Sequence, residues 1–475
     1  MYTFFISLFL LLTGFLIYSR VAEKAFCPDN RETPAVRMND GVDYIPMPQW
    51  KVFLIQLLNI AGTGPVFGAL SGAIFGPVVY IWIVFGCIFA GAVHDYMCGM
   101  ISVRNNGASV SEIAGKYLGN GMRYFMRVFS LVLLIMCGVV FTTGPADLLA
   151  MLTPKSLNAR FWLWVVTVYY LVATFVSIDK IIGKIYPLFG ACLIFMALGV
   201  VFSLLLSDRF VMPELWNNFE NQHAEGIPVW PFMFVTVACG AISGFHATQT
   251  PMMARCIKTE KQGRTVFYGA MIAEGVIALI WAAAGVTYYE DSQALLAAGG
   301  GCSAVVYNIC RTSMGKLGAL LAMVGVIVCP ITSGDTAYRS ARLIIADWFK
   351  LDQKNWKKRL LVTIPILGVG VIVSHMDYST VWRCFSWSNQ SLATISLWAA
   401  VIYLRQNGRN RTVAIIPAIF MGAVTMTYFV AAPEWLGYWW EKMNVKFDTY
   451  YIIALIAGVL FAVATLLVYK RNTGD

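Results

Sequence analysis

Two apolar segments carry polar residues and glycines that a continuous helix in a bilayer would avoid. The first is Asn59-Ile-Ala-Gly62-Thr63-Gly64-Pro65, and the second runs from Cys239 through Ser243, Gly244 and His246 to Gln249 and Pro251. Glycine weakens the preference for helix, and proline removes a backbone donor. We therefore predict that both segments are broken helices. The N-termini of half-helices present free N–H groups and partial positive charge, which suit a carboxylate ligand.

The side chains beside these breaks are candidates for contact with a small ligand. His246 either pairs with a carboxylate or is a core histidine bonded to a backbone carbonyl. Asn389 and Gln390 either cap the broken helices or reach the ligand. In the alternative interpretation, the glycines only permit close helix packing. The candidate substrate-binding residues are Asn59, Gly62, Thr63, Gly64, Ser243, Gly244, His246, Gln249, Asn389 and Gln390.

A carboxylate and an imidazole stand side by side in another apolar run, at His94 and Asp95. Charged groups inside a span are costly unless they are paired or hydrated, so such a pair is a candidate for binding and releasing a proton. The alternative is a structural pair that seats the helix against the loop containing Arg104.

A third group consists of Cys329, Thr332 and Ser333, which fall at i, i+3 and i+4 and therefore share one helix face. Two hydroxyls facing the carbonyls that follow Ala61 would supply hard oxygen ligands for an ion. This predicts a candidate sodium site at Ala61, Thr332 and Ser333. Asp335 is a further candidate for ion coupling, although a salt bridge to Arg339 or Arg342 is the preferred interpretation.

The elements that must position these residues are membrane helices. The chain has 475 residues, of which 59% are hydrophobic and 13% charged, whereas soluble domains carry roughly 25% charged residues. Apolar runs long enough to span a bilayer predict about thirteen transmembrane helices. They lie near 1–20, 50–71, 77–103, 122–144, 161–179, 186–207, 228–253, 265–288, 317–336, 360–375, 379–404, 412–431 and 449–469.

The basic residues predict the orientation of these helices. With the N-terminus outside and the C-terminus in the cytoplasm, 27 Lys and Arg residues fall in inner segments and seven in outer ones. This asymmetry follows the positive-inside rule. The net charge of +10 therefore reflects membrane topology, and no nucleic-acid partner is expected.

Five spans separate the start of one broken helix from the start of the other. Because an odd-numbered repeat re-enters from the opposite side, we predict a five-plus-five inverted repeat. The predicted order is an extra N-terminal helix (1–20), a cytoplasmic loop (21–49), a first repeat (50–207), a second repeat (228–404) and two C-terminal helices with a short tail (412–475).

Several other function classes are disfavoured. No span carries the polar stripe of a channel, and no HExxH or GxSxG pattern indicates an enzyme, so no catalytic residue or cofactor is expected. A sensing role would act through a partner protein, since the loops leave no room for a signalling domain. In the outer loop 289–316, Cys302 and Cys310 could form a disulfide if that face of the membrane is oxidising.

The same motifs resemble the carbon starvation protein A family of membrane transporters. They are NIAGTGP (59–65), AGAVHDY (90–96), ISVRNNGASVSEIAG (101–115), ACGAISGFHATQ (238–249), CPITSGDTAYRSARLIIAD (329–347) and SNQSLATISLW (388–398). The resemblance implies the leucine-transporter-like fold of the amino acid–polyamine–organocation superfamily, whose sodium sites lie between the corresponding helices. It also implies that the outer loop 289–316 forms a helical lid, since superfamily members place one there. The chain differs in lacking the C-terminal extension of longer members and in having His94 where many relatives have glutamine.

The residues and the resemblance together predict a secondary transporter in the bacterial inner membrane. It would import a small carboxylate such as pyruvate with protons; a short-peptide or amino-acid symporter that uses sodium, and a transport-linked nutrient sensor, are the alternatives. The expected partners are the substrate, the coupling ion and membrane lipid.

Overall fold

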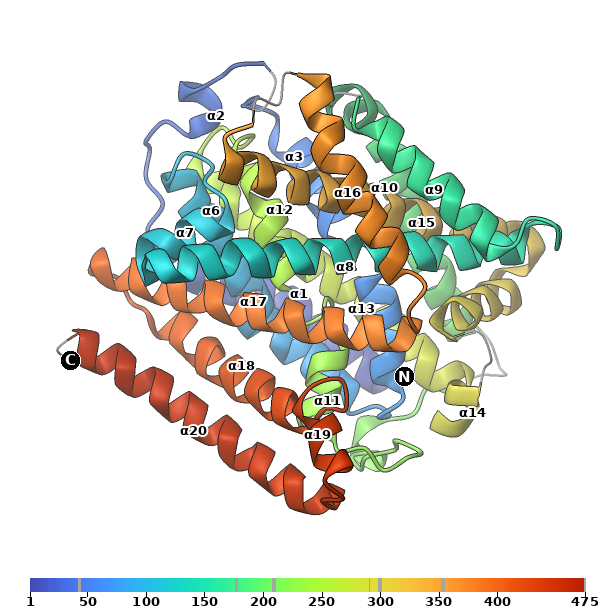
Figure 1. Cartoon of the computed structure of the whole chain (residues 1–475). Helices are drawn as coiled ribbons and strands as arrows, with labels where there is room; N and C mark the ends of the chain where they lie inside the picture. The colour runs from blue at the N-terminus through green and yellow to red at the C-terminus, as the bar shows by residue number, and fades with distance from the viewer. Residues whose placement is uncertain are drawn as a thin grey trace.

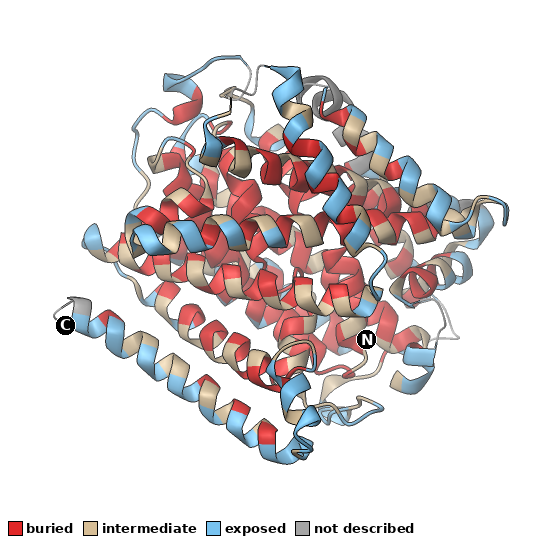
Figure 2. Ribbon diagram, in the orientation of Figure 1, coloured by how far each residue is buried: buried red, intermediate tan, exposed pale blue. Residues whose placement is uncertain are grey.

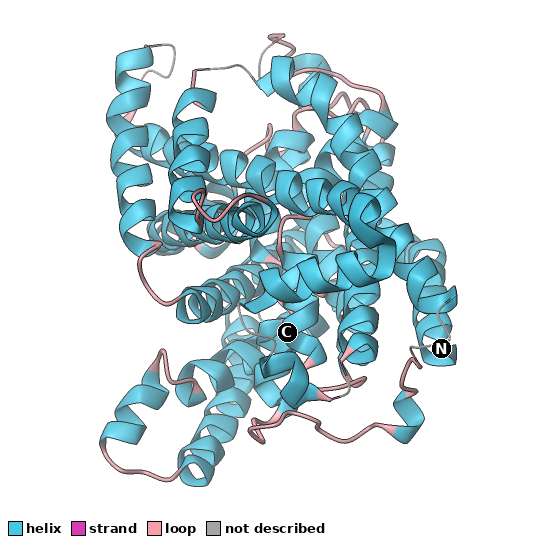
Figure 3. Ribbon diagram, turned by 90° about the vertical axis from the view of Figure 1, so that its right-hand side faces the viewer, coloured by secondary structure: helices cyan, strands magenta, loops and turns pink. Residues whose placement is uncertain are grey.

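The computed structural model describes residues 1–41, 44–175, 178–206, 211–289, 291–297, 301–351 and 355–473. The regular elements in this part of the chain are all helices, joined by loops, and it contains no strand (Figures 1 and 3). The long helices are α1 (Tyr2–Phe26), α3 (Gln49–Ile60), α6 (Ala92–Arg104), α8 (Asn120–Leu152), α9 (Ala159–Ala173), α10 (Ile178–Leu206), α12 (Gly244–Ala254), α13 (Gly269–Tyr288), α15 (Gly301–Phe349), α16 (Trp356–Val373), α17 (Tyr378–Gln406), α18 (Thr412–Ala431) and α20 (Phe447–Thr473). The shorter ones are α2 (Pro34–Arg37), α4 (Ala69–Ala73), α5 (Val79–Ile81), α7 (Val110–Leu118), α11 (Val229–Thr236), α14 (Ser292–Ala297) and α19 (Leu436–Lys442).

A helix or a broken helix pair lies at each of the thirteen predicted apolar runs. Within the described ranges, six helices are long and apolar enough to cross a bilayer, and a bent pair adds a seventh. The protein is therefore a multi-pass, all-helical membrane protein. The full number of crossings and the inverted repeat remain predictions.

The exposed apolar side chains of α20 indicate that this fold is surrounded by lipid. In its most apolar stretch only 11% of the residues are buried, compared with 89% in the helical segment Glu260–Tyr288. Ile456, Leu460 and Val463 are 54%, 62% and 48% exposed, and α20 forms an edge of the bundle (Figure 2). An exposed row of large aliphatic side chains is stable against lipid chains and costly in water.

The first predicted break is confirmed, and its cause is local. Helix α3 ends at Ile60, and the chain resumes as a π-helical turn (Gly64–Gly68) that continues into α4, with a bend of 56°. Pro65 lies in the first turn of the new segment, where its missing N–H removes no helical hydrogen bond.

The second break lies slightly earlier than the sequence indicates. Helix α11 ends at Thr236, the backbone is irregular to Ser243, and α12 begins at Gly244. Gln249 and Pro251, which we placed within the break, are inside α12 instead. A proline inside a buried membrane helix is tolerated because neighbouring helices can satisfy the freed backbone groups.

The contacts between loops sort into two groups that match the predicted sides of the membrane. Arg104, at the end of α6, bonds to Glu260 at 2.9 Å and to the carbonyl of Cys27 at 2.8 Å, and all three were predicted to be on the inner side. On the predicted outer side, the N-terminal amine lies 2.5 Å from Glu214. These contacts therefore agree with the predicted alternation of the loops between two sides of the membrane. Which side faces the cytoplasm remains a prediction.

The described part of the segment predicted as an outer lid is helical, as expected, but its two cysteines are not paired. Helix α15 begins at Gly301 and runs to Phe349, with a break at Gly315, where φ is +66°. Cys302 and Cys310 therefore share one helix and are both free thiols. Eight residues of helix separate their Cα atoms by about 12 Å, beyond the reach of a disulfide, so the predicted pairing is wrong.

Candidate functional site

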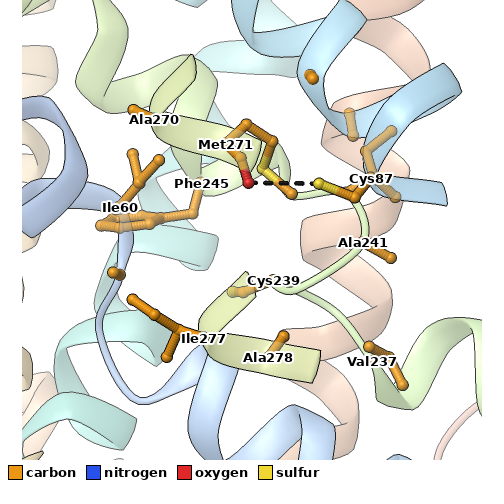
Figure 4. Close-up of a cluster of buried hydrophobic side chains, with 14 of the residues drawn as sticks. Ile60, Cys87, Val237, Cys239, Ala241, Phe245, Ala270, Met271, Ile277 and Ala278 are labelled. Atoms are coloured by element: carbon orange, nitrogen blue, oxygen red, sulfur yellow. Dashed lines mark hydrogen bonds between the residues drawn. The ribbon is translucent and has the colours of Figure 1, made fainter. Parts of the chain in front are cut away.

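The two helix breaks lie against each other in the core. A Cβ atom placed on Gly64 would be 2.2 Å from Cβ of Cys239, so the first break approaches the second as closely as a glycine permits. Figure 4 shows the irregular chain after Ile60 on one side and the irregular chain through Val237, Cys239 and Ala241 on the other. The breaks bring irregular backbone and buried polar side chains to one place inside the bundle.

This approach gives a direct test. Gly64→Ala is expected to lower the yield and melting temperature of the folded protein, because forcing a methyl group into filled space typically costs about 1–3 kcal/mol. Gly368→Ala in α16, where no heavy atom lies within 4 Å of the added Cβ, is the matched control and should melt no lower than the parent. Both are measured as the melting temperature of the detergent-solubilised protein, and equal melting temperatures would contradict the close packing of the two breaks.

The N-terminus of α12 is held by α17. Asn389 accepts a hydrogen bond from the backbone N–H of Phe245 at 2.6 Å and lies 3.1 Å from the Ser243 hydroxyl. Gln390 donates to the carbonyl of Ala238 at 3.3 Å. Both side chains therefore cap the second break, which was one of the two roles that the sequence left open. A Cβ on Gly244 would lie 2.3 Å from the carbonyl oxygen of Asn389, which explains the glycine there.

Four ionisable side chains form a connected, fully buried row across α6, α12 and α13. Nδ1 of His94 lies 2.8 Å from one oxygen of Asp95, and Nδ1 of His246 lies 2.8 Å from the other. Nε2 of His246 lies 3.2 Å from Glu274. All four side chains have 0% exposure. Because only Nδ1 has hydrogen-bond geometry to a carboxylate, that of Asp95, this geometry assigns the proton of neutral His246 to Nδ1.

This row corrects two expectations. His246 forms a hydrogen bond with the carboxylate of Asp95 and lies 3.2 Å from that of Glu274, and it does not bond to a backbone carbonyl. Asp95 does not seat its helix against Arg104, which pairs with Glu260. Glu274 was missed, although a lone acidic residue within the apolar run 265–288 was a sufficient signal.

The candidate sodium site has the predicted neighbours but a different bonding pattern. Cys329 donates to the carbonyl of Ala61 at 2.6 Å, and Ser333 donates to the carbonyl of Leu58 at 3.0 Å. Thr332 bonds within its own helix, to the carbonyl of Cys329 at 2.8 Å. α15 therefore faces the first break as expected, and ion binding there stays a prediction.

The remaining candidates separate into buried groups near the breaks and one remote ion pair. The hydroxyl of Thr63 is buried and has no hydrogen-bond partner among the described residues, and the same holds for the side-chain oxygen of Gln249. Asn59 is buried at the end of α3. Asp335 pairs with Arg339 at 3.3 Å, as predicted, and Arg339 also bonds to the carbonyl of Ala173 on α9.

The fold is similar to that of a solved transporter. A crystal structure of the Eremococcus coleocola manganese transporter superposes on 92% of this chain and 99% of its own, with a TM-score of 0.59 and 12% sequence identity. At this identity the likeness concerns the fold alone.

Sequence comparison places the chain among bacterial membrane proteins. An uncharacterized membrane protein of Haemophilus influenzae is 44% identical over 351 residues, which cover 63% of this chain and 95% of that protein. The Bacillus subtilis peptide transporter CstA is 25% identical over 92% of this chain and 91% of its own. The Escherichia coli pyruvate/proton symporter BtsT is 27% identical over 55% of this chain and 45% of its own. The sequence model of carbon starvation protein CstA matches residues 1–154, 148–294 and 286–428. The chain therefore belongs to the carbon starvation protein CstA family.

Proposed function

We propose that this chain is a secondary active transporter that imports a small, pyruvate-like carboxylate across the bacterial inner membrane in symport with protons. The observation that carries the proposal is the contact between two unwound segments inside the bundle, represented by the approach of Gly64 to Cys239. Discontinuous helices that meet near mid-membrane are the usual construction of a transporter binding site. The named relatives are transporters, one of them a pyruvate/proton symporter.

The proposed site suits an anion. The first turn of α12 supplies N–H groups at its positive end, and the hydroxyls of Thr63 and Ser243 add donors nearby. These residues are buried, so substrate access requires the helices around the breaks to move. We propose that this movement is alternating access by two inverted repeats, 50–207 and 228–404, within a thirteen-helix protein whose N-terminus is outside and whose C-terminus is cytoplasmic.

Short peptides are the second candidate substrate, since the Bacillus subtilis relative, which aligns with 92% of this chain, is named a peptide transporter. Both candidates are tested by uptake of labelled pyruvate into proteoliposomes under separately imposed proton and sodium gradients, with dipeptides as competitors. Accumulation driven by external acid, and insensitive to dipeptides, would support the carboxylate–proton proposal. Strict dependence on sodium would instead favour an ion site at Ala61, Thr332 and Ser333, and dipeptide counterflow without pyruvate uptake would favour the peptide proposal.

A substitution that removes the Thr63 hydroxyl can test ligand binding separately from folding. Because it has no partner among the described residues, Thr63→Val removes no hydrogen bond of the folded protein and should leave its melting temperature unchanged. If the hydroxyl donates to a charged substrate, uptake should fall about tenfold, since such a bond contributes roughly 1.5–3 kcal/mol.

Thr363→Val in α16 is the matched control, because its hydroxyl is equally buried and equally lacks a partner in the described chain. The control should transport at the parent rate. Parent-level uptake by Thr63→Val in a stably folded protein would remove Thr63 from the site.

A further inference from the structure

A thiol, an imidazole and a carboxylate converge beside the second break. The sulfur of Cys239, a ring nitrogen of His246 and a carboxylate oxygen of Glu274 all lie within 4.8 Å of one another. Cys239 belongs to the irregular segment, His246 to α12 and Glu274 to α13, and all three are fully buried. The fold thus brings together three different donor types from three consecutive segments.

Two of the three donor groups lack a hydrogen-bond partner in the described chain, whereas the sulfur of Cys239 contacts Ser243 and Asn389, each at 3.6 Å. Neither oxygen of Glu274 accepts a hydrogen bond from the part of the chain that the structure describes, and Nε2 of His246 has no hydrogen-bond partner there either. The two groups lie 3.2 Å apart, without hydrogen-bond geometry. A buried carboxylate is expensive unless a cation, hydrogen-bond donors or a bound proton compensates it, so this cluster has an open place for a positive ion.

The neighbours of His246 favour binding of a cation at its second ring nitrogen, Nε2. Nδ1 of His246 lies 2.8 Å from Asp95, whose other oxygen is held by His94 at 2.8 Å. A metal-binding histidine usually donates its remote N–H to a carboxylate in this way, which fixes the tautomer and makes the free nitrogen more basic. Because both oxygens of Asp95 are engaged, the structure gives it the role of a positioning residue.

We propose that Cys239, His246 and Glu274 bind a divalent cation of the zinc class. Thiolate, imidazole and carboxylate together are a zinc ligand set, and such a mixture excludes magnesium or calcium as the preferred ion. Zinc–ligand bonds of about 2.0–2.3 Å place neighbouring donors roughly 3.3–3.8 Å apart. The separation of His246 and Glu274, 3.2 Å, already approaches this range, and the sulfur of Cys239, within 4.8 Å of both, has to move inward by at most about 1 Å.

Such an ion would join the second break and α12 to α13. Three protein donors leave a tetrahedral ion one further coordination position. The competing explanation is a protonated His246 paired with an ionised Glu274, with no metal. The proposal does not depend on the transport function, because binding is measured directly on the purified protein.

The test is a titration of chelator-stripped, detergent-solubilised full-length protein with Co²⁺, followed by competition with Zn²⁺. We expect one Co²⁺ per chain, a near-ultraviolet thiolate-to-cobalt absorption band, visible bands of a four-coordinate ion, and displacement by Zn²⁺. Cys239→Ser should lose the thiolate band, while Cys310→Ser, which alters an equally buried thiol on α15, should retain it. Asp95→Asn should keep the band but weaken the affinity about 10- to 100-fold, as loss of an outer-shell partner does.

Two outcomes would overturn the proposal. One is the absence of a thiolate band in the parent protein, and the other is a band that survives Cys239→Ser. If Cys239→Ser does not fold, Glu274→Gln provides the second variant, and X-ray absorption of the zinc-loaded parent reports directly whether one sulfur is bound. Parent protein that transports but binds no Co²⁺ would leave the proposed function standing and reject the metal site alone.

Discussion

Asn389→Asp is expected to fold normally and to lose carboxylate transport. The aspartate keeps the oxygen that accepts the Phe245 N–H, so the N-terminus of α12 stays capped. It also places a negative charge where the proposed substrate carries its own. Two such charges about 5 Å apart repel by roughly 3 kcal/mol at an effective dielectric constant of 20. The KM for pyruvate should therefore rise at least tenfold, which corresponds to about 1.4 kcal/mol.

The matched control for this variant is Asn158→Asp. Asn158 caps α9 by accepting the N–H of Phe161 at 3.0 Å, so the chemical change is the same, although Asn158 is exposed and caps its own helix. The control should show the parent KM. KM is measured by initial rates of uptake into proteoliposomes, with melting temperature as the check on folding. An unchanged KM for a folded Asn389→Asp protein would reject the anion site at α12.

Among conservative substitutions in the loops, Glu260→Gln is expected to lower the free energy of unfolding the most. Glu260 is fully buried and accepts two hydrogen bonds from Arg104, both at 2.9 Å, and one from the N–H of Asp29 at 2.8 Å. Removing its charge leaves the guanidinium of Arg104, which is 8% exposed, without its main partner. Breaking a buried ion pair on one side typically costs about 3–5 kcal/mol.

The exposed pair formed by Glu112 and Arg127 supplies the comparison. Their side chains lie 2.7 Å apart, with Glu112 41% exposed, so Glu112→Gln should cost about 0–1 kcal/mol. Thermal unfolding in detergent should show a fall of several degrees for Glu260→Gln and almost none for Glu112→Gln. Equal falls in melting temperature would mean that the Arg104–Glu260 pair does not hold the end of α6, the segment containing Glu260 and the end of α1 together.

Much of the fold can be predicted from the sequence because its causes are local. The apolar runs are long enough to be helices wherever they occur, and the Gly62-Thr63-Gly64-Pro65 sequence interrupts one of them whatever lies around it. The ion pair of Asp335 and Arg339, four residues apart on one helix, is predictable for the same reason.

The candidate site is decided by contacts between distant segments. Asp95 meets His246 from 151 positions away, and Asn389 meets Ser243 from 146. Local pattern carries little information on such pairs, since a helix like α13 is apolar on every side and its periodicity does not indicate which face turns inward. The sequence by itself therefore determined the helices, their breaks and the family motifs. Only the tertiary packing decided that Glu274 faces His246, because burial of the carboxylate depends on which helices surround it.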